Sequence, residues 1–524
     1  MKSDVNLSPP GHYGRLLTRA DGAGTYTYID YDINDRAHTV EGPWGGTVTY
    51  TYDALGRVHA TQVGSGEATT YNYDLLGRLT SVSVGTRAFT DSYTGADTVP
   101  ARLDRPGGNH TDYTYDNLSR LKDITSKTPG GAVISANAFT YNKAHMRTVE
   151  TVTNGAAMSL PVGSIAYGTA NSVNQLPDCT YDNDGNMTGW WANFVAYTAE
   201  YDAENRLASV LSDDQRLGSH SYAFTYNADG ALAKQVVDGV ETRFVLDGFN
   251  VLEERNASNA VTRSFAWDPT APGGIGGLLE MTQDGKHYNY YYDGKGNVSA
   301  VINADPDLSQ TAGEFVYYRN DSFGVLRVKS GTLEQPYMFS TKRYYESLAV
   351  SYFGYRWENL LLGRWLTHDP AGESADVNLY RAMGNSIINR IDPLGLKQFE
   401  MTIWTGGTVG YFIFGGGAYN VTITDQTTYR STVYTMKVFG IGFGLPSFRA
   451  NSRPVKFNTD DCRKSDSFDG NGYIAGASVE VIVGLKVGGS FKIPNGPTIV
   501  SDFFDWHRGG FDVSASANIT YWSH

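Results

Sequence analysis

The sequence predicts an all-β protein, from its composition, its strand-like alternation and a short internal repeat. Of its 524 residues, 13% are aromatic and only 19% are charged, with 36 Tyr and 59 Gly. Tyr, Thr and Val favour a pleated, half-buried surface and Gly favours tight turns, whereas a disordered chain would hold fewer aromatic and more charged residues. Residues 47–52, Thr-Val-Thr-Tyr-Thr-Tyr, alternate with the period of two that is typical of strands.

A Tyr-Asp motif, followed by a turn and an Arg, recurs through the first half of the chain. Tyr31, Tyr52 and Tyr73 lie 21 residues apart. An Asp at the start of a turn accepts hydrogen bonds from backbone amides two residues on, and Gly supplies positive φ. Each unit is therefore predicted to be a strand, a turn and a strand that cannot bury its own face, so stacked units should form one long continuous sheet. The copies begin at Tyr31, Tyr52, Tyr73, Tyr115, Tyr181 and Tyr201.

The spacing and the Tyr-Asp-x-x-Gly-Arg pattern of these units resemble the YD repeats of the Rhs family. The resemblance covers residues 20–396 and implies a hollow β-shell, a partial cocoon or spiral of hairpins that encloses a C-terminal polypeptide. We therefore expect an N-terminal extension at 1–19, a YD-repeat shell at 20–243 and an Rhs repeat-associated core at 244–396. A variable, β-rich C-terminal domain is expected at 397–524.

The second half of the resemblance rests on the motifs that precede residue 397. Two Asp-Pro-x-Gly motifs begin at Asp369 and Asp392. Such a pair resembles that of self-cleaving Rhs proteins and Tc toxin C subunits, in which the core acts as an intramolecular aspartyl protease and cuts after the Leu of the second motif. The resemblance thus implies cleavage between Leu396 and Lys397.

Aspartyl proteolysis requires two carboxyl groups at one peptide bond. Two close carboxylates do not readily ionise together, so they share a proton. One then activates water while the other protonates the carbonyl oxygen or the leaving amine. Asp369 and Asp392 are the predicted catalytic pair, and Arg356 is predicted to orient a carboxylate through bidentate hydrogen bonds.

The core departs from the family pattern at two positions. Glu373 ends the first Asp-Pro motif in place of Leu, and Asn359 stands where many family members have Asp, with Glu358 beside it as a substitute. The alternative to catalysis is that both Asp-Pro motifs are only turns, with Pro fixing φ and Gly supplying positive φ.

After Leu396 the repeat motifs end, and residues 397–524 are predicted to form a separate β-rich unit without a catalytic metal site. Its two polar clusters lack metal or nucleophile spacing and are predicted to be polar loops. Alternating segments at 408–423 and 477–490 leave a transmembrane barrel open as an alternative to a soluble β-sandwich or small barrel. The clusters are Asp460, Asp461, Cys462 and Arg463, and Asp502, Asp505, His507 and Arg508. The predicted strands span 399–404, 411–414, 419–424, 432–439, 478–483, 490–493 and 513–520.

Charge and cysteine content exclude several classes of site. The net charge of −13 argues against nucleic-acid binding through the shell, because phosphates require a basic surface. The chain has two distant cysteines, Cys179 and Cys462, so we expect neither a disulfide framework nor a metal site, and no cofactor. The first 17 residues lack the apolar core of a signal peptide, so we expect export without one.

The resemblance implies an Rhs polymorphic toxin that encapsulates and delivers a C-terminal effector. The implied partners are a secretion or injection machine and an immunity protein for the tail, with the protein cytoplasmic in the producer and then secreted or displayed at a cell surface. The large N-terminal part of full Rhs proteins is lacking, so an incomplete cocoon, an orphan cassette or a fragment is expected. The alternative is a carbohydrate-binding or adhesive surface protein, which exposed aromatic rows would favour.

Overall fold

The computed structural model describes residues 4–7, 15–154, 168–396 and several strands between 399 and 523, with gaps at 96, 98, 193–194, 215–217, 305–312, 371, 375 and 387–388. Regular structure in these residues consists of β-strands and short 3-10 helices, which confirms the all-β prediction. The chain divides into two compact units, Met1–Gly410 and Tyr411–His524. The 3-10 helices are η1 Pro43–Gly45, η2 Pro106–Gly108, η3 Pro272–Gly274, η4 Phe339–Thr341, η5 Gly372–Ser374 and η6 Ala382–Asn385.

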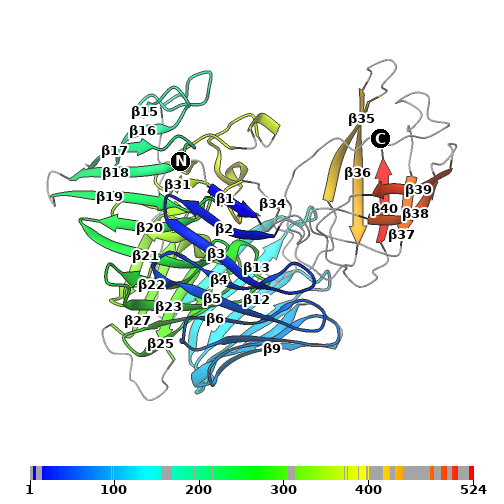
Figure 1. Ribbon diagram of the computed structural model, residues 1–524, viewed down its shortest axis with the longest axis horizontal. Coiled ribbons are helices and arrows are strands. Elements are labelled where there is room, and N and C mark those ends of the chain that lie inside the picture. Colours follow the sequence, from blue (N-terminus) through cyan, green and yellow to red (C-terminus); the bar gives the residue numbers. More distant parts are fainter. Residues whose placement is uncertain are drawn as a thin grey trace. The chain divides into compact units, whose positions relative to one another are not determined.

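The first unit begins with sheet A, an antiparallel meander of 14 strands in which each strand pairs with the next. Its strands run from blue to cyan in Figure 1. They are β1 Asp4–Leu7, β2 Leu16–Asp21, β3 Gly24–Tyr31, β4 Ala37–Glu41, β5 Thr47–Tyr52, β6 Val58–Val63, β7 Thr69–Tyr73, β8 Leu79–Val84, β9 Arg87–Tyr93, β10 Pro100–Asp104, β11 His110–Tyr115, β12 Leu121–Lys127, β13 Val133–Tyr141 and β14 Arg147–Asn154.

Sheet B is a second meander of 14 strands, green in Figure 1, so within the described residues the repeats form two sheets and not the single continuous sheet that we expected. Sheet B runs without a break through residue 244, which lies inside β21. Its strands are β15 Thr180–Tyr181, β16 Met187–Ala192, β17 Val195–Tyr201, β18 Leu207–Asp214, β19 Gly218–Tyr226, β20 Leu232–Val237, β21 Val240–Asp247, β22 Asn250–Asn256, β23 Val261–Trp267, β24 Leu278–Gln283, β25 Lys286–Tyr292, β26 Val298–Asn303, β27 Phe315–Asn320 and β28 Leu326–Gly331.

The turn of each repeat is built around its Asp, as the motif predicts. Asp53 Oδ1 accepts hydrogen bonds from the amides of Leu55 and Arg57, both at 2.9 Å, and Asp53 Oδ2 accepts one from Arg57 Nε at 2.7 Å. Gly56 between them has a φ of +82°. One carboxylate thus closes the turn and fixes the Arg that starts the next strand.

Successive repeats are joined by their Tyr and Arg side chains. The Arg57 guanidinium lies 4.1 Å from the ring centre of Tyr73 in the next repeat, a cation–π contact. The hydroxyl of Tyr73 donates to the carbonyl of Val58, 15 residues earlier, at 3.3 Å. The same pattern recurs at Arg36 with Tyr52, and it makes the repeat residues scaffold.

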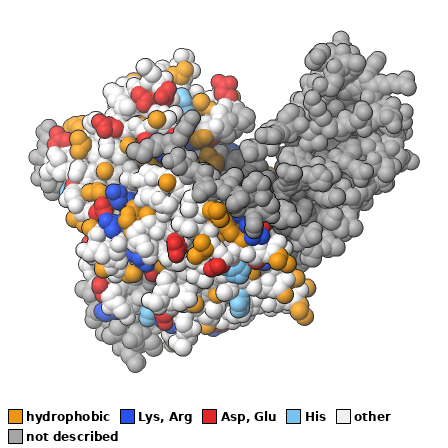
Figure 2. Space-filling view, viewed as in Figure 1, with side chains coloured by type: hydrophobic (Ala, Val, Ile, Leu, Met, Phe, Trp, Pro, Cys, Tyr) orange, Lys and Arg blue, Asp and Glu red, His pale blue; other side chains and the backbone are white. Residues whose placement is uncertain are grey.

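Polar pairs connect sheet A to sheet B. Arg19 in β2 pairs with Asp229 at 2.8 Å, and Arg87 in β9 pairs with the buried Glu280 of β24 at 2.9 Å. On the face visible in Figure 2, hydrophobic side chains are scattered among polar ones. The two sheets are therefore held by ion pairs as well as by apolar packing.

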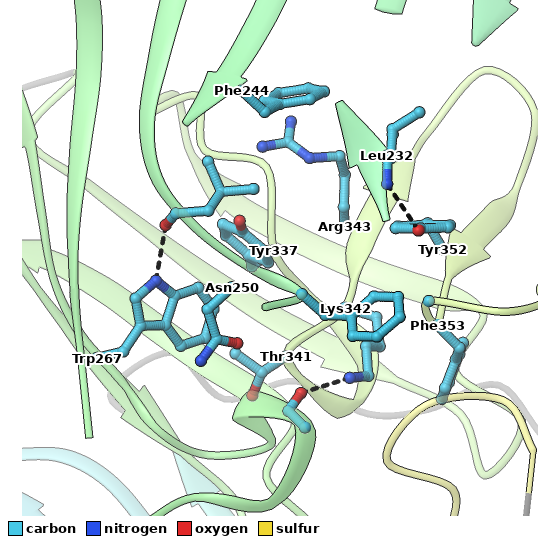
Figure 3. A pocket seen from close by; sticks show the side chains of 14 residues that line it. Leu232, Phe244, Asn250, Trp267, Tyr337, Thr341, Lys342, Arg343, Tyr352 and Phe353 are labelled. Atoms are coloured by element: carbon cyan, nitrogen blue, oxygen red, sulfur yellow. Dashed lines mark hydrogen bonds between the residues drawn. The ribbon is translucent and has the colours of Figure 1, made fainter. Parts of the chain in front are cut away.

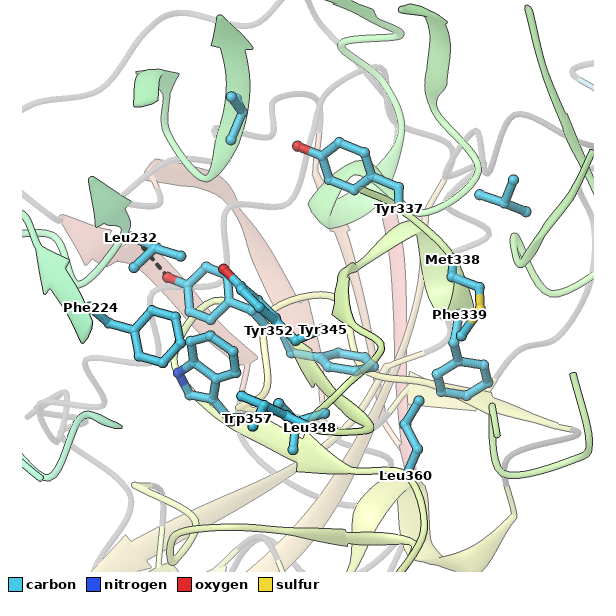
Figure 4. Close-up of a cluster of buried hydrophobic side chains, with 14 of the residues drawn as sticks. Phe224, Leu232, Tyr337, Met338, Phe339, Tyr345, Leu348, Tyr352, Trp357 and Leu360 are labelled. Carbon is cyan, nitrogen blue, oxygen red and sulfur yellow. Dashed lines mark hydrogen bonds between the residues drawn. The ribbon is translucent and has the colours of Figure 1, made fainter. Parts of the chain in front are cut away.

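The segment after sheet B folds into two small sheets, of which the first packs on sheet B. Trp357 packs against Phe224 of sheet B, with ring centres 4.6 Å apart, and against Tyr345 and Tyr352 (Figure 4). Trp365 and Leu366 are fully buried in the same cluster. This aromatic core fixes the segment that carries the Asp-Pro motifs. Sheet C comprises β29 Arg343–Tyr345, β30 Val350–Tyr352, β31 Trp357–Asn359 and β32 Arg364–Trp365, and the other pair is β33 Arg390–Ile391 with β34 Phe399–Glu400.

The second unit contains a six-stranded antiparallel sheet, which agrees with the prediction of a β-rich tail. Predicted strands 419–424 and 432–439 fall within β35 and β36, whereas 478–483 lies outside the described residues. Asp502 and Asp505 lie in β39, so their assignment to a loop is wrong. The strands, in spatial order, are β35 Gly417–Thr424, β36 Ser431–Gly440, β40 Asn518–Ser523, β37 Gly472–Gly476, β38 Lys486–Lys492 and β39 Thr498–Asp505.

Candidate active site

Three short elements of the closing core bring the predicted site residues together. Arg356 directly precedes β31, Asp369 follows β32, and Asp392 follows β33. Arg356 Nη2 lies 2.8 Å from Asp369 Oδ2 and 3.4 Å from Asp392 Oδ2. One guanidinium nitrogen therefore bridges two carboxylates that are 23 residues apart in the sequence.

The bridge is deeply buried. The side chains of Arg356, Asp369 and Asp392 are 1%, 5% and 0% exposed. Arg356 also lies over the ring of Trp365, with its guanidinium carbon 4.2 Å from the ring centre. Burial lowers the pKa of Arg356, while the two carboxylates oppose that shift. The carboxyls thus lie where solvent does not screen their charges.

Asp392 closes the turn of the second Asp-Pro motif. Its Oδ1 accepts hydrogen bonds from the amides of Leu394, Gly395 and Leu396, at 3.3, 2.7 and 3.1 Å. Burial raises the pKa of Asp392 to about 6, against the lowering effects of Arg356 and these amides. The predicted catalytic carboxyl therefore contacts the residue that precedes the predicted cleavage point.

The carbonyl groups of the same turn are bound one after another by the core. Lys342 Nζ donates to the Gly273 carbonyl at 2.6 Å (Figure 3) and also to the Pro393 carbonyl at 2.6 Å. The amide of Tyr355 donates to the Leu394 carbonyl at 2.9 Å, and Arg356 Nε donates to the Gly395 carbonyl. Burial lowers the pKa of Lys342 to about 7, although the charge of Asp392 opposes this.

Lys342 lies beside a small cavity of about 30 Å³, lined also by Gly273, Thr341 and Phe353 (Figure 3). Close packing surrounds this cavity, because a Cβ added at Gly273 would lie 2.2 Å from the Pro393 carbonyl oxygen. The turn 392–396 is therefore held on several sides. Sequence analysis missed this Lys clamp, which joins residues that lie 51 positions apart.

The two positions that depart from the family pattern have different surroundings. Asn359 Oδ1 accepts a hydrogen bond from the Leu362 amide at 3.1 Å, so this side chain closes a local turn. Glu358 is 0% exposed, and neither of its carboxyl oxygens has a hydrogen-bond partner. Burial raises the pKa of Glu358 well above its usual value, the charge of Asp392 adds to the rise, and Arg356 opposes it.

The first Asp-Pro motif is also a turn. The Asp369 carbonyl accepts the amide of Gly372 at 2.8 Å, and Glu373 is exposed in η5, away from the buried bridge. Both Asp-Pro motifs are turns, as the alternative interpretation held, and their carboxyls still meet at Arg356. Leu396 is half-buried, whereas Lys397, the other side of the predicted cut, lies outside the described residues.

The described residues contain no cluster of three or more His, Cys, Asp or Glu side chains that could hold a metal ion. Within the same part of the chain, no helix has the length and apolar character to cross a membrane. His507, Arg508 and the cluster Asp460, Asp461, Cys462 and Arg463 lie outside the described residues.

Comparisons with known proteins agree with the shell. The family model described as Teneurin YD-shell matches residues 28–158. The tRNA3(Ser)-specific nuclease WapA of Bacillus spizizenii is 26% identical over 315 residues, which cover 58% of this chain and 12% of that protein. The toxin subunit YenC1 of Yersinia entomophaga is 24% identical over 223 residues, covering 38% of this chain and 22% of that one. This chain thus spans about an eighth of the length of the Bacillus relative.

A solved structure supports the fold. The crystal structure of TcdB2-TccC3-TEV aligns with a TM-score of 0.57 at 15% sequence identity, over 75% of this chain and 25% of that one. At that identity the likeness concerns the fold alone.

Proposed function

We propose, from the premise that this chain belongs to the Rhs/YD-repeat proteins, that it encloses the segment after Leu396 and releases it by cutting its own chain at the Leu396–Lys397 bond. The relatives that support a toxin-type role are the WapA nuclease and the toxin subunit YenC1. The nuclease activity named for WapA and the toxin role named for YenC1 belong to those proteins. For this chain, encapsulation, self-cleavage and delivery of the tail are the proposal.

The observation that carries the proposal is the meeting of Asp369 and Asp392 at Arg356. A turn alone requires neither full burial nor a guanidinium shared with a second carboxyl. The amide of Leu396 donates to Asp392, which keeps the acyl side of the proposed cut beside the proposed catalytic carboxyl. Holding a reacting group next to a catalytic one lowers the barrier to reaction substantially.

The chemistry follows from the arrangement. One carboxylate accepts a proton from water as its oxygen attacks the Leu396 carbonyl carbon. The C–N bond to Lys397 then breaks, and an acid of the site protonates the leaving amine. Arg356 keeps the two carboxylates at fixed positions, and the clamp of Lys342, Tyr355 and Arg356 on the carbonyls of residues 393–395 restrains the turn while the bond is cut.

The test uses the full chain and matched asparagine variants. The wild-type protein should separate under denaturing conditions into residues 1–396 and a 128-residue tail, identified by intact mass. Asp369→Asn and Asp392→Asn should each leave one uncut chain. Asp53→Asn is the control, because Asp53 makes the same kind of turn with an Arg but lies in the repeat region. A wild-type chain that stays whole after prolonged incubation would refute the proposal.

Retention of the cut tail distinguishes encapsulation from a surface adhesive. The repeat tyrosines are committed to ladder packing, as Tyr52 and Tyr73 illustrate, so they do not form the exposed aromatic row that adhesion would favour. We expect the two fragments to elute together in size-exclusion chromatography under native conditions and to separate in denaturant. Early separation under native conditions would contradict encapsulation.

The partners in this proposal are an injection or secretion machine and an immunity protein that protects the producer from the tail. Bacteria that express the full wild-type chain without an immunity protein should grow more slowly than bacteria that express Asp392→Asn. Equal growth at equal protein levels would argue against a toxic tail that depends on release.

A further inference from the structure

Glu358 is an unusual carboxyl within the closing core. Among the described residues, it alone has both carboxyl oxygens buried without a hydrogen-bond partner. Other buried acids have a partner on at least one oxygen: Glu254 pairs with Arg263, Glu280 pairs with Arg87, and Asp268 Oδ1 accepts two hydrogen bonds from Thr270. An ionised carboxylate without partners in such a place would be strongly unfavourable, so these surroundings favour the protonated form of Glu358.

Strand geometry points Glu358 toward the carboxylate bridge. Successive side chains of a strand lie on opposite faces, so Glu358 lies on the face of β31 opposite to Trp357. Contacts agree, because Trp357 packs among the aromatic rings of Phe224 and Tyr352 while Arg356 binds the two Asp side chains. Glu358 also senses the charges of both Arg356 and Asp392.

Asp392 itself lacks a ready proton near neutral pH. Burial raises its pKa only to about 6, so it is ionised at higher pH, whereas an aspartyl mechanism requires one group to act as an acid. A protonated carboxyl that is close enough to interact with Asp392 supplies what the Asp pair does not hold.

We infer that Glu358 is the proton source of the cleavage site and acts through Asp392. This inference rests on the proposed self-cleavage. Glu358 is a positioning residue for the proton, since it acts on the bond to be cut through Asp392.

The proposed step balances without any other reactant. Water forms a C–O bond to the Leu396 carbonyl carbon and gives a proton to the Asp369 carboxylate. Asp392 receives the proton of Glu358 and passes it to the nitrogen of Lys397 as the C–N bond breaks. Return of the proton from Asp369 restores Glu358, and the net reaction is one peptide bond plus one water giving a carboxyl and an amine.

This assignment predicts a distinct dependence on pH. The charged groups that act on Glu358 are Asp392 and Arg356; Asp369 shares Arg356, and Asp392 also acts on the charge of Lys342. Cleavage requires an ionised Asp392 and a protonated Glu358. The rate should therefore fall below about pH 6, where Asp392 takes up a proton, and fall again at high pH when Glu358 loses its own.

The experiment follows cleavage of labelled full-length chain after cell-free translation is stopped and the pH is shifted between about 5 and about 9. Glu358→Gln keeps the shape but has no acidic proton, and we expect its rate to be about 100-fold lower, without the high-pH fall. Glu358→Asp should restore part of the rate. Ser351→Ala is the control, because Ser351 pairs with Glu358 across β30 and β31 and is equally buried.

A second measurement tests the proton directly. In the uncut Asp369→Asn chain, infrared spectra at neutral pH should show carbonyl stretches of protonated carboxylic acids. Glu358→Gln should remove the Glu358 component, and the difference spectrum separates it from that of Asp91, whose pKa burial also raises. If wild type is cut and Glu358→Gln is cut equally fast, or if the difference spectrum shows no acid band, the inference is wrong while self-cleavage stands. If wild type is never cut, the proposed function fails and the inference falls with it.

Discussion

The turns at Asp53 and Asp392 use the same local chemistry in two different environments. In both, Oδ1 accepts amides from residues two and four positions on, and Oδ2 faces an Arg. Partial burial acts to raise the pKa of Asp53, but the hydrogen bonds from Arg57 outweigh it and lower that pKa below its usual value. Burial of Asp392 wins instead and raises its pKa to about 6.

The source of the Arg explains the difference. Arg57 lies four residues after Asp53 and serves that carboxylate, whereas Arg356 comes from 36 residues before Asp392 and is shared with Asp369. The same kind of turn thus has a carboxyl with a raised pKa when the carboxyl is buried and shares its Arg with a second carboxylate. The comparison shows how one kind of Asp turn gives a lowered or a raised carboxyl pKa, depending on its burial and on how many carboxylates share its Arg.

Substituting Arg356 or Arg57 should give the largest difference in unfolding free energy between the two turns. Arg356→Met leaves two buried carboxyls without their cation, which costs about 3–5 kcal/mol of unfolding free energy. Arg57→Met removes a partly exposed pair, and we expect a loss of at most about 1 kcal/mol. Urea unfolding followed by the fluorescence of the buried Trp residues measures both. Equal losses would mean that the two turns are energetically alike.

Adding one methyl group tests the packing around the candidate site. Gly64 and Gly273 have nearly equal φ values of +53° and +54°, but an added Cβ would meet nothing within 4 Å at Gly64 and would lie 2.2 Å from the Pro393 oxygen at Gly273. Gly64→Ala should therefore cost about 1–2 kcal/mol for the left-handed backbone alone. Gly273→Ala should cost about 1–3 kcal/mol more and slow cleavage. Similar stabilities for the two variants would argue against a tight clamp.

These contrasts also separate what sequence analysis could predict from what it could not. The Asp turn at residue 53 was predictable, because its hydrogen bonds span only two to four residues and recur with the repeat. The site residues Asp369, Asp392 and Arg356 came from a resemblance, and no local rule places them together. The role of Lys342 could not be predicted because its partner Pro393 is distant in the sequence. The lack of hydrogen-bond partners at Glu358 could not be predicted either, because it depends on residues that are distant in the sequence.

The two turns should respond to acid in opposite directions. The raised pKa of Asp392 means that the folded chain binds a proton more tightly than the unfolded chain, so its contribution to stability falls by about 2 kcal/mol as the pH rises from about 4 to about 6. The lowered pKa of Asp53 makes its contribution disappear as the pH falls below about 4.

Unfolding free energies against pH measure both effects in the uncut Asp369→Asn chain. Adding Asp392→Asn should remove the fall between about pH 4 and 6, and adding Asp53→Asn should instead weaken the loss of stability in acid. If Asp392→Asn changed only the loss of stability below about pH 4, Asp392 would be an ordinary turn residue like Asp53.

The smallest expected difference in stability concerns one Tyr hydroxyl in the repeat region and one in the closing core. The hydroxyl of Tyr73 makes one hydrogen bond, to the Val58 carbonyl in a partly solvated part of the ladder. The hydroxyl of Tyr352 is buried, accepts the Leu232 amide at 2.9 Å and donates to the Gly230 carbonyl at 3.0 Å. Removing the Tyr352 hydroxyl therefore leaves two buried backbone groups without a partner, whereas water can replace the Tyr73 hydroxyl at Val58.

We expect Tyr352→Phe to cost about 2 kcal/mol and Tyr73→Phe about 1 kcal/mol or less in urea unfolding. If Tyr73→Phe cost as much as Tyr352→Phe, the repeat ladder would be as dry as the closing core, and burial could not be what separates the turn at Asp53 from the turn at Asp392.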